Sequence, residues 1–347
     1  MQFQYRTTLY SLLIATFTCG CALAQGSPAT GYHLLHEYKL AGDTGWDYLT
    51  MDAPSRRLYI SRGTHVQVIN IDNGKLEGDI TDLKGVHGIA LDKSANKGYI
   101  SDGRDNSVVV FDLKSLKQTG KVQAGTNPDA ILFDPATKRV FAFNGRSGNA
   151  TVIESKDNSV AGTIDLGGKP EFGVSDGKGK IFVNLEDKSE LVQIDAKELK
   201  VLNTWPLAPA EGPSGLAIDT DHEILFSGCD NEKMAIVDGN SGKLITTETI
   251  GKGVDATAFD KGLHQAYSSN GQSGTITIVK ENSPTSFSPA GDVTTKPRAR
   301  TMTVDEKTHN LITVTAQFEQ QQEPAPGQQR QRPKMVPDTF EVLVYGR

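Results

Sequence analysis

The chain has 347 residues, of which 42 are Asp or Glu and 36 are Lys or Arg, with a formal charge of -6 and a pI near 5.7. Binding to a phosphate backbone requires clustered positive charge, so this balance argues against a nucleic-acid partner. Hydrophobic residues make up 37% of the chain, which argues against a disordered polyelectrolyte and against a multi-pass membrane protein. The length is sufficient to bury a large core.

The first 24 residues have the pattern of a secretory signal peptide. Arg6 precedes an apolar run that begins at Leu9, and residues 22–24 read ALA, a small-residue cleavage pattern. We therefore expect residues 1–24 to be removed. The mature chain, residues 25–347, is expected to be periplasmic or secreted, a monomer, and without a transmembrane segment of its own.

The cysteines leave one alternative for this leader. Cys21 follows a glycine, so lipid anchoring through Cys21 is the alternative to simple cleavage. After cleavage only Cys229 remains, so no intrachain disulfide is expected to hold the exported chain together.

An internal repeat dominates the mature chain. A short apolar run that ends in Asp recurs as YLTMD, GIALD, AILFD, FGVSD, GLAID, ATAFD and TMTVD. The seven Asp residues are spaced 40 to 45 residues apart, a period typical of propeller blades. They are Asp52, Asp92, Asp134, Asp176, Asp219, Asp260 and Asp305. In every unit this Asp is expected to be a turn residue that binds nearby backbone amides.

Each unit reads as a four-stranded antiparallel meander. After the first run come two further β-rich runs, such as KGYIS and SVVVFDL, and then a fourth, such as LKQTGKVQA. Such sheets must stack on copies of themselves, which predicts an all-β fold, a seven-bladed β-propeller. The seventh unit ends without a fourth strand, so residues 32–40 (YHLLHEYKL) are expected to complete the last blade and close the ring. The whole of residues 25–347 is then one domain, with blades that start near 46, 87, 129, 171, 214, 255 and 300.

Two segments carry a resemblance to a known family. KGYISDGRDNSVVVFDLKSLK and RVFAFNGRSGNATVIES resemble the YVTN-repeat propellers, the YncE-like family of exported bacterial proteins. The resemblance implies a seven-bladed propeller with a binding role. The corresponding tetrapeptides here read YISD, FAFN, FVNL and YSSN, so the architecture is carried over and no functional residue is.

The loops that enter the blades are expected to ring the channel. In an antiparallel meander the starts of all first strands share one face, and the residues five positions before each repeat Asp should form a polar channel mouth. These residues are Asp47, His87, Asp129, Glu171, Ser214, Asp255 and Arg300. Converging carboxylates favour a cation, a cationic ligand or a basic peptide, whereas the alternative is that these are simply solvated strand ends.

A Gln- and Pro-rich insertion interrupts the last blade. Residues 319–337 include Arg330, Arg332 and Lys334 and lack the composition of a packed core. We expect a disordered loop on the channel-mouth face. It is either a tolerated insertion or a recognition flap whose positive charge could contact the acidic mouth.

Two classes of function remain open. The first, and favoured, is a non-enzymatic scaffold that binds a protein, peptide or small-molecule ligand at the channel mouth. It has no catalytic residue and no predicted cofactor, although a divalent cation is left open. The second is a metal-dependent, lactonase-like hydrolase or lyase with an ion on Asp129, Glu171 or Asp255 and with His87 as acid or base. A quinone-dependent dehydrogenase is the weakest, since only Trp46 and Phe172 could stack on its cofactor.

Overall fold

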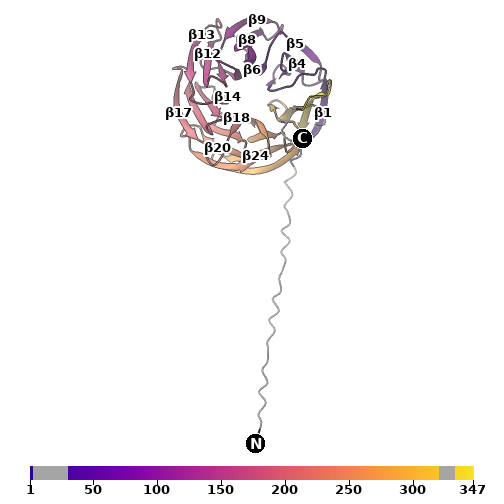
Figure 1. The fold of residues 1–347 in the computed structure, drawn as a ribbon, viewed down its shortest axis with the longest axis vertical. Helices are drawn as coiled ribbons and strands as arrows, with labels where there is room; N and C mark the ends of the chain where they lie inside the picture. The colour runs from indigo at the N-terminus through magenta and orange to yellow at the C-terminus, as the bar shows by residue number, and fades with distance from the viewer. Residues whose placement is uncertain (3–29, 320–332) are drawn as a thin grey trace, which may run out of the picture.

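The computed structural model describes residues 1–2, 30–319 and 333–347, and the strands in these residues form seven four-stranded antiparallel sheets around a central axis (Figure 1). The predicted seven-bladed β-propeller is therefore confirmed. The proposed signal peptide falls outside the described residues except for its first two, as do positions 320–332 of the proposed loop. Among the described residues, no helix combines the length and hydrophobicity needed to cross a bilayer.

Each blade contributes a first strand nearest the axis and a fourth strand at the rim, and blades are numbered here in chain order from β2. The first strands are β2 (Leu49–Asp52), β6 (Val86–Asp92), β10 (Pro128–Asp134), β14 (Pro170–Ser175), β18 (Pro213–Asp219), β22 (Val254–Asp260) and β26 (Met302–Asp305). The second strands are β3 (Arg57–Ser61), β7 (Lys97–Asp102), β11 (Arg139–Asn144), β15 (Lys180–Leu185), β19 (Ile224–Cys229), β23 (Gln265–Asn270) and β27 (Asn310–Thr315).

The outer half of each blade follows the same order. The third strands are β4 (Val66–Asn70), β8 (Ser107–Asp112), β12 (Asn149–Glu154), β16 (Glu190–Asp195), β20 (Lys233–Asp238), β24 (Thr275–Ser283) and β28 (Phe340–Gly346). The fourth strands are β5 (Leu76–Ile80), β9 (Gln118–Gln123), β13 (Val160–Asp165), β17 (Lys200–Pro206), β21 (Leu244–Thr249), β25 (Ser286–Thr294) and, for blade 7, β1 (His33–Leu40). A short 3-10 helix, η1 (Gly103–Asp105), joins β7 to β8.

The middle strands are buried on both faces because each blade packs between two others. In β8 the run Val108, Val109, Val110 and Phe111 is completely buried, whereas the fourth strand β9 of the same blade is mostly exposed. A sheet covered on both sides requires continuous apolar strands, and a rim strand does not. The core therefore lies between the blades, in layers that repeat around the ring.

The N-terminal strand closes the ring as predicted. β1 pairs antiparallel with β28, in a register that sets Leu40 opposite Phe340. Beside this joint the buried Arg62 guanidinium of blade 1 lies 3.8 Å from the centre of the Phe340 ring of blade 7. Arg62 also donates hydrogen bonds to the side chain of Gln67 and to the carbonyl of Thr44. The pairing of β1 with β28 thus completes blade 7, and the buried cation-π contact between Arg62 and Phe340 joins blade 7 to blade 1.

In blades 2 to 7 the carboxylate of the repeated Asp accepts backbone N–H groups of the following turn, and in blade 1 the Asp52 carboxylate accepts the Ser55 hydroxyl. The carboxylate of Asp134 accepts the Thr137 N–H at 2.8 Å, and that of Asp260 accepts the Leu263 N–H at 3.0 Å. The Asp219 carboxylate accepts the Asp221 N–H at 3.0 Å in the same way. These residues shape the turns on the face opposite the channel mouth.

Glycine is required where the first strands come closest. A Cβ atom at Gly215 of β18 would lie 2.3 Å from the backbone nitrogen of Thr257 in β22. Other first strands also carry small residues near the axis, such as Gly88 and Ala130. Tyr48, immediately before β2, is an exception, because its side chain reaches across the channel to blade 4.

Candidate functional site

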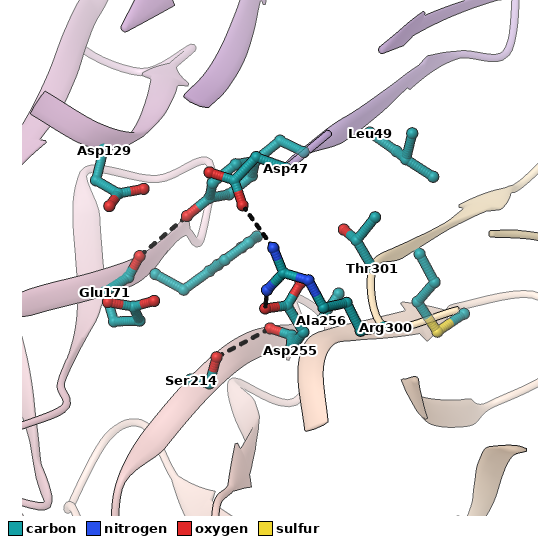
Figure 2. A pocket seen from close by; sticks show the side chains of 12 residues that line it. Asp47, Leu49, Asp129, Glu171, Ser214, Asp255, Ala256, Arg300 and Thr301 are labelled. Carbon is teal, nitrogen blue, oxygen red and sulfur yellow. Dashed lines mark hydrogen bonds and ion pairs between the residues drawn. The ribbon is translucent and has the colours of Figure 1, made fainter. Parts of the chain in front are cut away.

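The starts of the first strands surround a pocket at one end of the channel. Its lining includes six of the seven residues predicted from the repeat, namely Asp47, Asp129, Glu171, Ser214, Asp255 and Arg300 (Figure 2). The seventh, His87, contacts two of these. The structure therefore brings all seven side chains together, and six of them line a cavity of about 100 Å³.

Arg300 is the cation inside this pocket. Its guanidinium donates a hydrogen bond of 2.5 Å to Asp255 and lies 3.5 Å from an oxygen of Asp47 (Figure 2). Burial lowers the pKa of Arg300, but the charges of Asp255 and Asp47 outweigh that effect and raise it above its usual value. Arg300 is therefore a permanent positive charge that bridges blade 6 and blade 1.

His87 joins two further carboxylates. Its Nδ1 lies 2.5 Å from Asp47 and 3.6 Å from Asp129. Burial lowers the pKa of His87, while the hydrogen bond to Asp47 and the charge of Asp129 raise it, with a net upward shift. The imidazole thus favours its protonated form more than a free histidine does.

Glu171 lies on the blade 4 side of the pocket, next to two aromatic rings. Lys169 pairs with Glu171 at 3.0 Å and also contacts Glu186. Tyr48 donates a hydrogen bond of 3.2 Å to the Glu171 carbonyl, and its ring stacks on Phe172 with centroids 5.6 Å apart. The pocket therefore has an aromatic wall formed by blades 1 and 4.

Three carboxyl groups of the pocket bind protons more tightly than isolated ones. Burial raises the pKa of Asp129 to about 6. Burial, with the charge of Asp129, raises the pKa of Glu171 to about 7. Burial raises the pKa of Asp255 to about 7, with Asp47 and Asp129 adding to the shift and Arg300 opposing it. Carboxyl groups with raised pKa values that converge in one pocket are a typical electrostatic signature of a binding site.

Ser214 has a different role. Its hydroxyl donates to the backbone carbonyl of Asp255 at 3.1 Å, so it holds the start of β22, which presents Asp255 (Figure 2). No charge comes from blade 5, and the carboxylates come from blades 1, 3, 4 and 6.

One trio in this pocket has a spacing that could hold a metal. Ligand atoms of Asp47, His87 and Asp129 all lie within 4.8 Å of one another. Of the aromatic residues considered for a stacked cofactor, Phe172 lines the pocket. Trp46 instead packs against Phe318 and Phe340 in the joint between blades 1 and 7.

Sequence reasoning did not identify Tyr48 or Lys169 as site residues. Both are adjacent in sequence to the predicted ring, since Tyr48 follows Asp47 and Lys169 is two residues before Glu171. The detectable signal was that Tyr48 and Phe172 are bulky residues at a position where the other five blades carry Gly, Ala or Thr. Its contact with blade 4, across the channel, could not be read from spacing.

The ends of the predicted loop pair with each other near the mouth. Phe318 forms an isolated bridge with Met335, and the Glu319 N–H donates to the Lys334 carbonyl at 2.9 Å. The Arg298 guanidinium lies 4.3 Å from the centre of the Phe318 ring. The intervening positions 320–332, with Arg330 and Arg332, lie outside the described residues.

Comparisons with known proteins support the fold and leave the family open. None of the known protein-family models matches the chain. A search of curated proteins also finds no match.

Solved structures with the same architecture define the chain as a β-propeller. A chain of Kuenenia stuttgartiensis hydrazine synthase matches with a TM-score of 0.67 and 13% identity, covering 79% of this chain and 94% of that one. U3-55K matches with a TM-score of 0.72 and 10% identity, covering 92% and 99%. The WD40 repeats of RRP9 match with a TM-score of 0.72 and 9% identity, covering 92% and 98%. At these identities the likeness extends to the fold alone.

Proposed function

We propose that this protein is a non-enzymatic scaffold whose channel mouth binds a cationic side chain, a lysine ammonium or an arginine guanidinium, of a protein or peptide partner. The observation that carries the proposal is the convergence of four carboxylates from four blades, with the guanidinium of Arg300 already held between two of them. Charge-assisted hydrogen bonds to carboxylates are among the stronger polar contacts in proteins.

The size and lining of the pocket support a side chain more than a whole small molecule. A cavity of about 100 Å³ is smaller than a typical small-molecule site, but it is adequate for the end of one side chain. Tyr48 and Phe172 form a wall against which a lysine or arginine stem can pack. The remainder of the partner would rest on the loops around the mouth.

The test is calorimetric titration with capped single residues. N-acetyl-lysine-methylamide and its arginine analogue are expected to bind, whereas the norleucine analogue, which has the same stem without the charge, is not. Asp129→Asn and Glu171→Gln should each weaken binding about ten-fold, the value of one charge-assisted hydrogen bond. Glu198→Gln removes one exposed charge from blade 4 and serves as the matched control, expected to bind as the wild type does. Equal binding of lysine and norleucine probes would contradict the proposal.

We also propose that the chain belongs to the YVTN-repeat, YncE-like family and is exported. The seven-unit repeat and the leader pattern of residues 1–24 support this. The test is expression in a bacterium with the natural leader, followed by cell fractionation and intact-mass measurement. A periplasmic or secreted chain that begins at Gln25 is expected, and a full-length chain in the cytosol would overturn it.

A metal-dependent hydrolase or lyase is the second candidate, favoured by the spacing of Asp47, His87 and Asp129. In that case the purified protein would contain an ion that His87→Ala removes, and it would hydrolyse lactones in a chelator-sensitive way. A protein with metal-independent lysine binding and no such activity leaves the scaffold proposal ahead.

A further inference from the structure

A second cluster of titratable side chains lies at the opposite end of the channel wall, between blades 5 and 6. It consists of Asp219 at the end of β18, His222 in the following turn and Glu281 near the end of β24. Ser214 of the mouth begins the same strand that Asp219 ends, so the cluster is about 17 Å from the mouth by strand length. It is a separate feature from the pocket described above.

The position of Glu281 is structurally equivalent in six blades. In each of these blades, the backbone N–H at this position donates to the carbonyl of the residue immediately before the second strand, as Glu281 does to His264. The side chains at this position are Ile71, Leu113, Ser155, Ala196, Gly239 and Glu281. Only in blade 6, among these six, is the residue a carboxylate.

Blades 2 and 3 show how a polar residue at this position can interact with the neighbouring blade. There the Ser155 hydroxyl donates a hydrogen bond to the carboxylate of Asp92, the repeat Asp of the neighbouring blade. In blades 5 and 6 the same two positions hold Asp219 and Glu281, so a second carboxylate replaces the hydroxyl donor. Two facing carboxylates repel each other unless one takes up a proton or a cation lies between them.

Both carboxylates are buried, and Glu281 has no partner. The side chains of Asp219 and Glu281 are 1% and 2% exposed. Neither oxygen of Glu281 accepts a hydrogen bond from the residues that the structure describes. A buried carboxylate without hydrogen bonds is strongly disfavoured, which points to a missing positive ligand at this place.

His222 turns its Nδ1 toward both acids. Nδ1 lies 2.5 Å from the nearer oxygen of Asp219 and 3.6 Å from an oxygen of Glu281. The other oxygen of Asp219 accepts the Asp221 N–H, which holds the carboxylate in this orientation. The three ligand atoms all lie within 4.8 Å of one another.

We propose that Asp219, His222 and Glu281 bind a divalent first-row transition-metal ion, for which Zn²⁺ is the probe, and that the ion clips blade 5 to blade 6. One imidazole and two carboxylates form a common ligand set for such ions, and the double charge neutralises both acids. Ligands of tetrahedral Zn²⁺ lie about 3.3 Å apart, so the His222–Glu281 separation fits and the His222–Asp219 contact needs to widen by about 1 Å. The partly exposed turn that carries His222 leaves a fourth position open to water.

The neighbouring blade junction supplies a matched control. In blades 6 and 7, His309 contacts Asp260 at 2.8 Å, with the same exposures as the His222–Asp219 pair, 41% and 1%. In the part of the chain that the structure describes, no third histidine, cysteine or carboxylate lies close enough to join that pair as a metal ligand. A histidine–aspartate pair alone is therefore separable from the three-ligand site.

The experiment is titration of the chelator-treated full chain with Zn²⁺, followed by calorimetry and thermal unfolding. We expect one high-affinity site and a melting temperature raised by about 3–5 °C at saturating Zn²⁺. Glu281→Gln and His222→Gln should each weaken Zn²⁺ binding at least about ten-fold and abolish the thermal shift. His309→Gln and the mouth variant His87→Gln should retain both. Co²⁺ in place of Zn²⁺ should give a visible spectrum that is lost with His222→Gln.

Three outcomes would overturn the proposal. The wild type could fail to bind Zn²⁺, or Glu281→Gln could bind it as tightly as the wild type. His87→Gln could also abolish all binding, which would locate the metal at the mouth. Because His222 is on a partly exposed turn, His222→Gln remains a usable test if Glu281→Gln does not fold.

Discussion

Arg300 and Asp255 come from consecutive blades, and the Arg300 guanidinium donates a 2.5 Å hydrogen bond to the Asp255 carboxylate. The same guanidinium lies 3.5 Å from Asp47 of blade 1. The chain therefore places one of its own cations where the proposed ligand would bind. Arg300 neutralises part of the acidic pocket and competes with an incoming cation.

Replacing this internal cation should strengthen ligand binding. Arg300→Met removes the cationic partner of Asp255 and leaves Asp47 with His87 alone, so the affinity for N-acetyl-lysine-methylamide should rise about ten-fold. Calorimetry measures the change. Arg298→Met removes a charge two residues away and should leave the affinity unchanged. Weaker binding by Arg300→Met would mean that Arg300 contacts the ligand directly.

The pH dependence of stability should reveal the buried acid on blade 4. The pKa of Glu171 is about 7 in the folded protein and 4.5 ordinarily, so the folded state holds this proton more tightly. Its contribution to the free energy of unfolding is present below pH 4.5 and is lost as the pH rises through about 7. The free energy of unfolding of Glu171→Gln, measured relative to the wild type, should therefore rise by about 1–2 kcal/mol between pH 4.5 and about pH 8.

Urea unfolding of both proteins across this pH range measures the difference. Glu198→Gln, with an exposed carboxyl group, should show no comparable trend. If the difference in unfolding free energy between Glu171→Gln and the wild type does not change with pH, the Glu171 carboxylate is ionised throughout this range and its charge is balanced by neighbouring groups.

The joint between the first and last blades should depend on the shape of a guanidinium. Arg62 is fully buried, stacks on Phe340 and donates to Gln67 and to the Thr44 carbonyl. A lysine ammonium cannot stack flat on the Phe340 ring and at the same time donate both hydrogen bonds of the guanidinium. Arg62→Lys should therefore lower the free energy of unfolding by about 2–3 kcal/mol.

Chemical denaturation checks this value. Arg146→Lys, at an exposed turn, is the control and should change the unfolding free energy by less than about 0.5 kcal/mol. Equal stability of the two variants would mean that Arg62 is not a structural element of ring closure.

The close approach of the first strands predicts a sharp difference between two glycines. A Cβ at Gly215 would meet the Thr257 nitrogen at 2.3 Å, whereas a Cβ at Gly120 of β9 would meet nothing within 4 Å. Gly215→Ala should cost about 1–3 kcal/mol through overpacking, and Gly120→Ala should be neutral or slightly stabilising. Thermal unfolding of the pair tests the packing at the axis, and similar melting temperatures would contradict it.

Much of the fold could be predicted from the sequence because a blade is local in the chain. Consecutive strands pair through short hairpins, so the spacing of the repeat from Asp52 to Asp305 gives the blade number directly. The missing fourth strand of the last unit likewise indicated that residues 32–40 pair with β28. The repeat also located the mouth, since equivalent positions in equivalent blades must lie at the same end of the ring.

The contacts between blades were decided only by the tertiary structure. The reach of Tyr48 to Glu171, the bridge of Arg300 between Asp255 and Asp47, and the burial of Glu281 beside Asp219 all join residues at least 40 positions apart. Such contacts depend on the rotation between blades, the width of the channel and side-chain rotamers, none of which leaves a period in the sequence. The repeat therefore determined which residues gather at each end of the ring, whereas three-dimensional packing determined which of them touch, and so which charges are paired and which are left for a ligand.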